Sequence, residues 1–257
     1  MTDTRVLPLT GIHNFRDYGL YPVAGGGRVR PGLLWRSAQH GDATDEDLDV
    51  LKGLGIGTVV DLRGNSERDA KPCRRYPGFA AEVLFHDGET AGLHVQAAAS
   101  NPSAAEARAA MQRLYEGIAF RPTLVPMIQR YFTVLQDRDD ASLVHCVAGK
   151  DRTGFAVALL HHVLGVHPDD IMADYLLTNV AGNIDQRIAA GAEQIRAKYG
   201  AIDEDTIRTL MGVEPEYLDT AFQAIDAAHG SMDAYLADVI GLDDAAQGKL
   251  RARFIAD

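Results

Sequence analysis

HCVAGKDRTG, residues 145–154, is the stretch that decides how this chain folds. A short run ending in Leu143 and Val144 leads into it, and the apolar residues 155–160 lead out. This order predicts a strand, a tight loop and the start of a helix, with Gly149 permitting the turn. Backbone N–H groups of such a loop converge on one point, where the helix dipole adds positive potential. The stretch therefore predicts an oxyanion site that phosphate fits.

A nucleophile lies beneath this predicted site. The positive field would hold the sulfur of Cys146 as a thiolate, and Arg152 can bind two phosphate oxygens through its planar fork. Thr153 carries a hydroxyl that can hydrogen-bond the thiolate, and His145 can fix the loop. The predicted phosphate-binding residues are His145, Val147, Ala148, Gly149, Lys150, Asp151, Arg152 and Thr153. The pattern indicates phosphoester hydrolysis through a phosphocysteine; the alternative is an inert buried cysteine before a charged turn.

Three aspartates are candidates for the general acid that protonates the leaving oxygen. Asp151 lies in the loop itself, beside Arg152. Asp61 ends a predicted strand, and the carboxyl ends of parallel strands open onto such a site. Asp87 follows the next predicted strand. We expect Asp61 or Asp151 to act rather than Asp87.

The remaining cations near the motif have two interpretations each. Lys150 could bind a second phosphate of the substrate, or it could pair with a nearby carboxylate. Arg16, Arg36 and Arg63 could line a positive pocket, or they could form ion pairs that hold the N-terminal segment to the core.

Several segments resemble the bacterial tyrosine and dual-specificity phosphatase family typified by the mycobacterial phosphatase PtpB. Besides the HCVAGKDRTG stretch, the segments that carry the resemblance are residues 14–17, 30–37, 54–63, 173–176, 216–218 and 230–236. Residues 88–118 are the least alike. The resemblance implies a cysteine-dependent phosphatase fold without metal or organic cofactor, and substrates that are phosphotyrosine proteins or phosphoinositides. This family lacks the acid loop of the classical tyrosine phosphatases, so the resemblance leaves the three aspartates open.

Length and composition are those of one soluble globular domain over residues 1–257. The net charge of −11 argues against nucleic-acid binding and against adhesion to anionic membranes. No apolar stretch approaches the length of a membrane span, and the first residues lack a signal-peptide core. Two cysteines suit a reducing cytoplasm, so we expect a cytoplasmic protein, with export without a cleaved signal left open because some relatives are secreted in that way.

The elements predict an α/β fold, with a mostly parallel central sheet covered by helices and a helical C-terminal half. Core strands are expected at residues 58–62 and 82–86. Helices are expected at residues 44–54, 104–118, 122–135, 169–178, 184–199, 203–211, 215–229 and 232–239. Residues 104–118 and 184–211 could form a lid over the site; the alternative is that their apolar faces belong to the core.

Two other functions fit a loop of this kind. The chain could be a catalytically silent module that binds phosphorylated ligands, although such a module has no need of Cys146, Arg152 and Thr153 together. It could also be an arsenate reductase or a sulfurtransferase, for which Cys73 is the only other thiol. Cys73 could protect Cys146 as a disulfide, or it could be an ordinary loop residue. The adjacent His161 and His162 have no third ligand at a helpful spacing, so no metal site is predicted.

Overall fold

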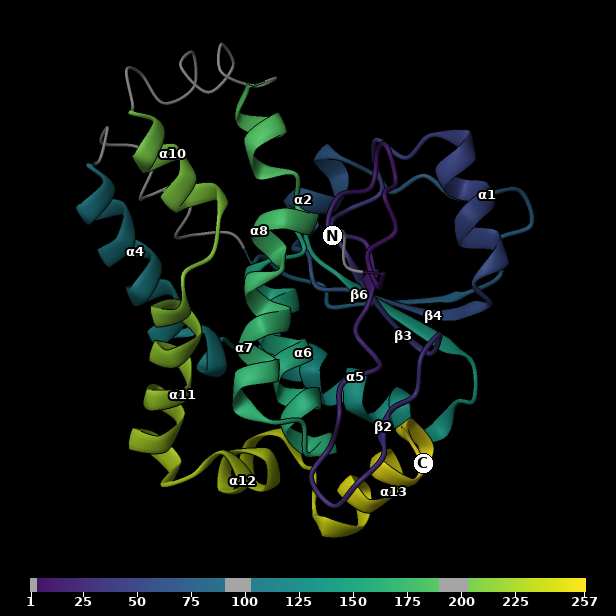
Figure 1. The fold of residues 1–257 in the computed structure, drawn as a ribbon, viewed down its shortest axis with the longest axis vertical. Helices are drawn as coiled ribbons and strands as arrows, with labels where there is room; N and C mark the ends of the chain where they lie inside the picture. The colour runs from purple at the N-terminus through teal and green to yellow at the C-terminus, as the bar shows by residue number, and fades with distance from the viewer. Residues whose placement is uncertain (1–3, 91–102, 190–202) are drawn as a thin grey trace.

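The computed structural model describes residues 4–90, 103–189 and 203–257, and a five-stranded sheet lies at its centre (Figure 1). The strand order is β1-β3-β6-β4-β5. The strands are β1 (Arg16–Asp17), β3 (Leu34–Ser37), β6 (Ala141–His145), β4 (Ile56–Asp61) and β5 (Glu82–Phe85). Three neighbouring pairs are parallel and only β1 runs antiparallel, to β3. The expected mostly parallel sheet is confirmed.

The motif strand β6 is central because every one of its residues is buried and it pairs on both sides. The prediction of a second core strand at residues 82–86 was wrong in one respect. β5 is a parallel strand, but it pairs only with β4 and forms the edge of the sheet, where Phe85 is 47% exposed. A second, two-stranded ribbon joins β2 (Arg28–Val29) to β7 (Ile255–Ala256), near the C-terminus.

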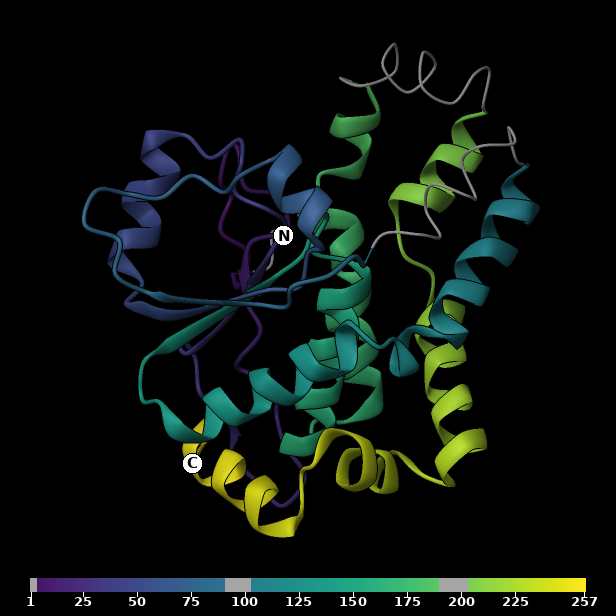
Figure 2. The ribbon, with the colours of Figure 1, turned by 180° about the vertical axis from the view of Figure 1, so that it is seen from behind.

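Helices cover both faces of the sheet (Figures 1 and 2). One face carries α1 (Asp45–Gly53), which begins at the capping box of Thr44 and packs Leu48 and Leu51 in a cluster with Val59 and Leu143. The next residues of the same strands, such as Val60, face the opposite way into a larger core. This alternation is the period of two that a sheet buried on both faces requires.

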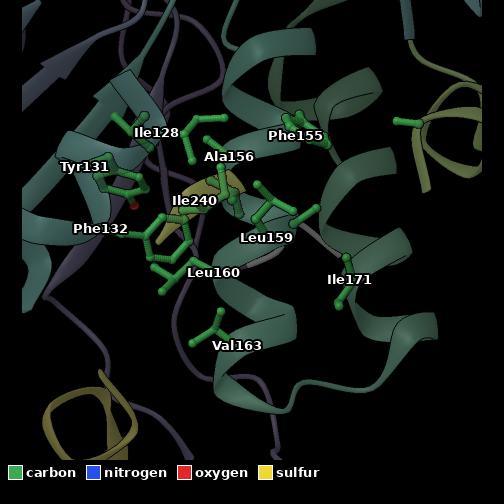
Figure 3. Close-up of a cluster of buried hydrophobic side chains, with 14 of the residues drawn as sticks. Ile128, Tyr131, Phe132, Phe155, Ala156, Leu159, Leu160, Val163, Ile171 and Ile240 are labelled. Atoms are coloured by element: carbon green, nitrogen blue, oxygen red, sulfur yellow. The ribbon is translucent and has the colours of Figure 1, made fainter. Parts of the chain in front are cut away.

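The larger core surrounds α6 (Asp151–Leu164), which begins inside the motif. Twelve of its fourteen residues are buried, so α6 is a central helix and not a surface one. Figure 3 shows Leu159, Leu160 and Val163 of α6 among side chains of α5 (Leu124–Asp137) and α7 (Pro168–Leu176). The helix that carries Arg152 is therefore held on all sides.

The C-terminal half is helical, as expected. Its elements are α8 (Thr178–Ala181), a helical stretch at residues 184–189, α10 (Glu204–Met211), α11 (Pro215–His229), α12 (Met232–Tyr235), the π-helix η2 (Leu236–Ile240) and α13 (Asp244–Phe254). The prediction missed α13, α8 and the short α2 (Asn65–Ala70) after β4. The expected helix at residues 184–199 is described only to residue 189, and residues 190–202 lie outside the described ranges.

Where the structure describes them, the segments considered as a lid form a helical layer beside the sheet (Figures 1 and 2). α4 (Ala104–Glu116) packs on α10 and α11 and leads into the short helix η1 (Ile118–Phe120). Met111, Leu114 and Tyr115 of α4 are buried in the same core as α6. The apolar face of α4 is thus part of the core, and whether this layer also opens as a lid stays a prediction.

Candidate active site

The loop between β6 and α6 turns its carbonyl groups outward. The Val147 carbonyl accepts a hydrogen bond from the N–H of Gln39 at 3.0 Å. Asn14 Nδ2 donates to the Ala148 carbonyl at 3.4 Å and to the Gly149 carbonyl at 2.7 Å. Because a peptide N–H points opposite to its carbonyl, outward carbonyls turn the neighbouring N–H groups toward the inside of the loop. This is the arrangement that binds an oxyanion.

Gly149 is required at its position for two reasons. Its φ of 67° is in the left-handed region, which favours glycine. A Cβ atom there would lie 2.4 Å from the backbone oxygen of Ser37 on the neighbouring strand. Arg36, also on β3, adds a second donor to the Gly149 carbonyl at 3.0 Å. The loop is therefore clamped against β3 at the residue where it turns.

Arg152 stands on the first turn of α6, beside the buried Cys146. Its two terminal nitrogens bind the carboxylate of Glu67 at 2.6 and 2.8 Å, and Nη1 also donates to the carbonyl of Leu62 at 3.0 Å and to Thr90 Oγ1 at 2.5 Å. Burial opposes the charge of Arg152, but the nearby sulfur of Cys146 and the Glu67 carboxylate raise its pKa. The guanidinium is thus permanently charged and held in one orientation.

His145 and Thr153 flank the cysteine within the buried interior. His145 Nδ1 lies 3.2 Å from the Cys146 carbonyl, an oxygen that can only accept, so Nδ1 carries the proton. Burial lowers the pKa of His145, which keeps the ring neutral, and the ring stacks on that of His40 at 5.2 Å. Thr153 Oγ1 is buried without a hydrogen-bond partner among the described residues. Its predicted bond to the Cys146 thiolate stays a prediction.

Asp151 begins α6 and is the aspartate nearest to the loop in sequence. Tyr115 of α4 donates its hydroxyl to Asp151 Oδ1 at 2.9 Å, and Tyr175 of α7 donates to Tyr115 at 2.7 Å. Burial, followed by the charge of Asp151, raises the pKa of Tyr115 well above its ordinary value. The phenol therefore keeps its proton and remains a donor that orients the Asp151 carboxyl group.

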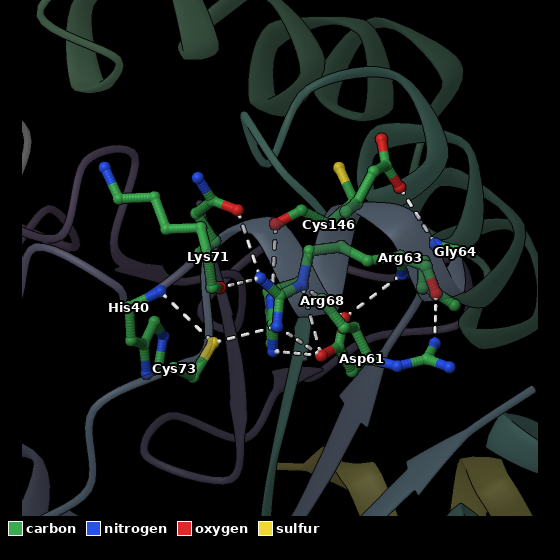
Figure 4. Close-up of polar contacts among 12 residues, drawn as sticks. His40, Asp61, Arg63, Gly64, Arg68, Lys71, Cys73 and Cys146 are labelled. Carbon is green, nitrogen blue, oxygen red and sulfur yellow. Dashed lines mark hydrogen bonds and ion pairs between the residues drawn. The ribbon is translucent and has the colours of Figure 1, made fainter. Parts of the chain in front are cut away.

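Asp61 does not have the environment of a general acid. It is buried at the end of β4, and its carboxylate accepts from Arg63 Nε at 2.9 Å and from Arg63 Nη2 at 2.7 Å (Figure 4). Burial alone would raise the pKa of Asp61, but the nearby His145 ring and the hydrogen bonds and charge of Arg63 lower it to about 2. A carboxyl group in this state holds no proton to donate near neutral pH, so the expectation of an acid at Asp61 is corrected.

Asp87 is also poorly placed. It follows β5, the edge strand, with β4 lying between β5 and the motif strand β6. Its side chain is exposed and accepts a hydrogen bond from Asn65 at 2.7 Å. Of the two aspartates that we expected to act as the general acid, only Asp151 therefore remains a candidate.

Lys150 connects the loop to the helical layer. Its ammonium group donates to the carbonyls of Leu210 at 2.6 Å and Gly212 at 3.0 Å, at the C-terminal end of α10. The carboxylate of Asp151 lies 3.7 Å away. The C-terminus of a helix attracts a cation through its unpaired carbonyls and its dipole. Lys150 thus has partners within the protein.

The three arginines considered for a positive pocket form ion pairs instead. Arg63 pairs with Asp61, and Arg16 and Arg36 share the fully buried Asp174 of α7. Burial and then the charge of Arg36 lower the pKa of Arg16 to about 10. The two pairs on Asp174 hold the N-terminal segment against α7, and Arg36 also donates to the loop at the Gly149 carbonyl.

Sequence reasoning did not identify four residues that position the site: Asn14, Glu67, Tyr115 and Asp174. Asn14 and Asp174 lie in segments that carried the family resemblance, which was a usable signal. Glu67 and Tyr115 lie outside those segments, and only the fold brings them to Arg152 and Asp151. Within the described ranges, no helix is long and apolar enough to span a membrane.

Comparison with known sequences places the chain among phosphatases. The profile described as "Tyrosine phosphatase family" matches residues 7–256. A Cupriavidus necator protein named as a candidate tyrosine-protein phosphatase is 35% identical over 252 residues, which cover 95% of this chain and 86% of that protein. The Mycobacterium tuberculosis protein named triple specificity protein phosphatase PtpB is 31% identical over 277 residues, which cover 96% of this chain and 98% of that protein.

Proposed function

The chain belongs to the tyrosine phosphatase family, and on that premise we propose that Cys146 is its nucleophile and Arg152 its phosphate ligand. It is a protein phosphatase, a hydrolase of phosphomonoesters. The observation that carries the assignment is the outward direction of the Val147, Ala148 and Gly149 carbonyls around Cys146. A loop fixed in this way offers its N–H groups to three phosphate oxygens without reorganisation.

In the first step, the Cys146 thiolate attacks phosphorus, the bond from phosphorus to the ester oxygen breaks, and the leaving oxygen takes a proton from Asp151. In the second step, water attacks the phosphocysteine, its proton goes to Asp151, and the bond from phosphorus to sulfur breaks. Arg152, held by Glu67, binds the equatorial oxygens in both transition states, where negative charge accumulates. His145 fixes the loop through its bond to the Cys146 carbonyl.

Phosphotyrosine in a protein is the substrate that the geometry supports best. A phosphoinositide with a second phosphate would need a further free cation beside the loop. Lys150, the residue considered for that role, donates instead to the carbonyls of Leu210 and Gly212. Binding of a second phosphate by Lys150 would first have to break both bonds, so phosphoinositide hydrolysis should be the slower activity.

The helical layer belongs to the same functional unit as the sheet. α4 supplies Tyr115 to Asp151, and the C-terminal end of α10 holds Lys150. Residues 1–257 accordingly act as one domain in this proposal. The layer would contribute to catalysis as a fixed part of the site, whether or not it also opens.

The test is hydrolysis of a generic aryl phosphate by the intact chain and by Cys146→Ser, Arg152→Lys and Cys73→Ser. Cys146→Ser should abolish turnover, Arg152→Lys should lower it by at least about a hundredfold, and Cys73→Ser should retain it. Phosphate binding without turnover in the intact chain would support the silent module instead. Dependence of activity on Cys73 would support the arsenate-reducing or sulfur-transferring alternative.

A further inference from the structure

A second cluster of chemically reactive groups lies behind the loop. The carboxylate of Asp61, the sulfur of Cys73 and a ring nitrogen of His145 all lie within 4.8 Å of one another. They come from β4, from the segment after α2 and from the end of β6. Cys73 is partly exposed, so solvent reaches the cluster from one side, while Asp61 and His145 are buried. The catalytic proposal uses His145 only to fix the loop, and it uses neither Asp61 nor Cys73.

One atom of this cluster lacks a partner. His145 Nε2 is buried and makes no hydrogen bond among the described residues. Its proton is on Nδ1, which donates to the Cys146 carbonyl, so Nε2 presents a lone pair. That lone pair faces Asp61 Oδ2 at 3.8 Å. Asp61 Oδ2 is paired with Arg63, but the buried lone pair of His145 Nε2 has no donor among the described residues, which costs free energy unless a cation reaches it.

The same arrangement is the one that proteins use to prepare a histidine for a metal. A metal-bound imidazole almost always donates its other N–H to a carbonyl or carboxylate, which fixes the tautomer and the ring orientation. Ligand atoms around tetrahedral zinc are about 3.5 Å apart, given bond lengths of about 2.0–2.3 Å. The separation between His145 Nε2 and Asp61 Oδ2 is close to that value. Cys73, on the partly exposed side, needs the largest movement.

Arg63 is the competitor for this site. Its Nη2 atom donates to Asp61 Oδ2 at 2.7 Å and to Cys73 Sγ at 3.1 Å, so a cationic nitrogen already bridges two of the three ligands (Figure 4). These two bonds oppose a metal most directly; Arg63 Nε also lies 3.2 Å from Asp61 Oδ2, and the N–H of His40 donates to Cys73 Sγ at 3.4 Å. Arg63 Nε would keep Asp61 Oδ1 at 2.9 Å, and Nη1 would keep the carbonyl of Lys71 at 2.8 Å. The nearby positive charges of Arg63 and Arg75 repel a dication, which weakens its binding.

We propose that Asp61, Cys73 and His145 bind one zinc ion, with water as the fourth ligand, and that this ion inhibits the enzyme. The mixed set of one sulfur, one imidazole nitrogen and one carboxylate oxygen suits zinc, whereas magnesium and calcium prefer oxygen alone. Zinc bound to His145 Nε2 would shift the His145 ring. Because this ring also donates to the carbonyl of Cys146, the shift would disturb the position of the nucleophile. The inhibition rests on the proposed function of Cys146, but the binding does not.

Zinc binding is measured by calorimetry on Cys146→Ser, which removes the nucleophilic thiol as a competing ligand. We expect one equivalent of zinc to bind. The double variant Cys73→Ser/Cys146→Ser should lose at least about tenfold in affinity, or about 1.4 kcal/mol. Cobalt should give a thiolate charge-transfer band with Cys146→Ser and none with the double variant. Absence of binding by Cys146→Ser, or equal binding by the double variant, would overturn the site.

Inhibition is measured separately on the chain with its native cysteines. Zinc should lower aryl phosphate turnover and a chelator should restore it, while Cys73→Ser should have normal turnover and resist zinc. Equal inhibition of both proteins would place the inhibitory zinc on Cys146 and overturn the regulatory part of the proposal. If the chain had no turnover at all, the proposed function would fail while the calorimetric result would still decide the metal site.

Discussion

Asn14 Nδ2 donates a hydrogen bond of 2.7 Å to the carbonyl of Gly149, across 135 positions of sequence. Asn14 is fully buried and its own backbone is left-handed, with a φ of 59°. Asparagine tolerates this conformation better than most residues, and its amide supplies the donor that the loop needs. The shape of the phosphate loop thus depends on a residue that is far away in sequence but adjacent in the fold.

Replacing Asn14 tests this dependence. Asn14→Gly accepts the left-handed backbone without strain; it removes the donor to the loop and also the Oδ1 acceptor of Arg16. Leaving the buried Gly149 carbonyl with one donor fewer should cost about 1–3 kcal/mol of unfolding free energy. We expect kcat/KM for an aryl phosphate to fall at least about tenfold, because the N–H groups lose their fixed direction. Unchanged kcat/KM with a lowered stability would show that Asn14 supports only the fold.

Glu67 should matter for phosphate binding through Arg152. Glu67→Gln keeps the shape but removes the charge that holds both terminal nitrogens of Arg152. Because a hydrogen bond to a charged group contributes about 1.5–3 kcal/mol, we expect kcat/KM to fall about tenfold or more. The matched control is Glu89→Gln, because Glu89 accepts hydrogen bonds from Ser66 in the first turn of α2 and none from Arg152. Similar losses in both variants would contradict a specific role of Glu67.

The general acid can be identified from leaving-group dependence. Asp151→Asn should lose about 10²–10⁴-fold in kcat on alkyl or phenyl phosphates, whose oxygens need a proton, and little on activated nitrophenyl esters. Asp61→Asn should reduce both classes of substrate alike, because its carboxylate serves an ion pair. A leaving-group dependence that appears with Asp61→Asn and not with Asp151→Asn would reverse the assignment.

The ion pair of Asp61 predicts a pH dependence of stability. Its folded pKa of about 2 lies below the ordinary value of 3.8, so the ionised form stabilises the fold. This contribution, about 2 kcal/mol, is complete above pH 4 and disappears as the pH falls through 2. The difference in unfolding free energy between the native chain and Asp61→Asn should therefore shrink from pH 5 to pH 2. Denaturant unfolding at several pH values measures it, and a constant difference would be inconsistent with the ion pair.

Lys150 offers a test of substrate class. Lys150→Met removes the two bonds to the end of α10, so amide hydrogen exchange in α10 should become faster. Turnover of phosphotyrosine peptides should change by less than about tenfold, since Lys150 does not contact the phosphate in our proposal. Lys52→Met, at the exposed end of α1, is the control. A selective loss of phosphoinositide hydrolysis with unchanged exchange in α10 would restore Lys150 as a substrate ligand.

Much of the fold follows from local patterns in the sequence. Apolar spacing predicted α5 and α11, and the run around Val59 and Val60 predicted a buried parallel strand. α13 was missed because its apolar residues are sparse and its sequence, DAAQGKLRARF, includes a glycine. The edge position of β5 could not be predicted, because strand order depends on which neighbours pair in three dimensions.

The residues of the site, like the elements of the fold, include some that the sequence predicts and some that it does not. Cys146, Arg152 and the glycine between them are close in sequence, so their pattern predicts the loop. The choice among the aspartates could not be made in this way, because it depends on what surrounds each carboxylate. Arg63 neutralises Asp61, whereas Tyr115 reaches Asp151 from a helix 36 positions earlier. Burial and long-range partners, which set the protonation of a carboxyl group, have no local signature.

The burial of α6 on all sides has a consequence for engineering this protein. A volume change at Leu159 or Leu160 is transmitted along a rigid helix to Arg152, so attempts to raise thermal stability there would disturb catalysis at the same time. The layer formed by α1 and the opposite face of the sheet is a separate cluster, around Trp35 and Leu48. Thermostable variants that retain their turnover are best sought in that second layer.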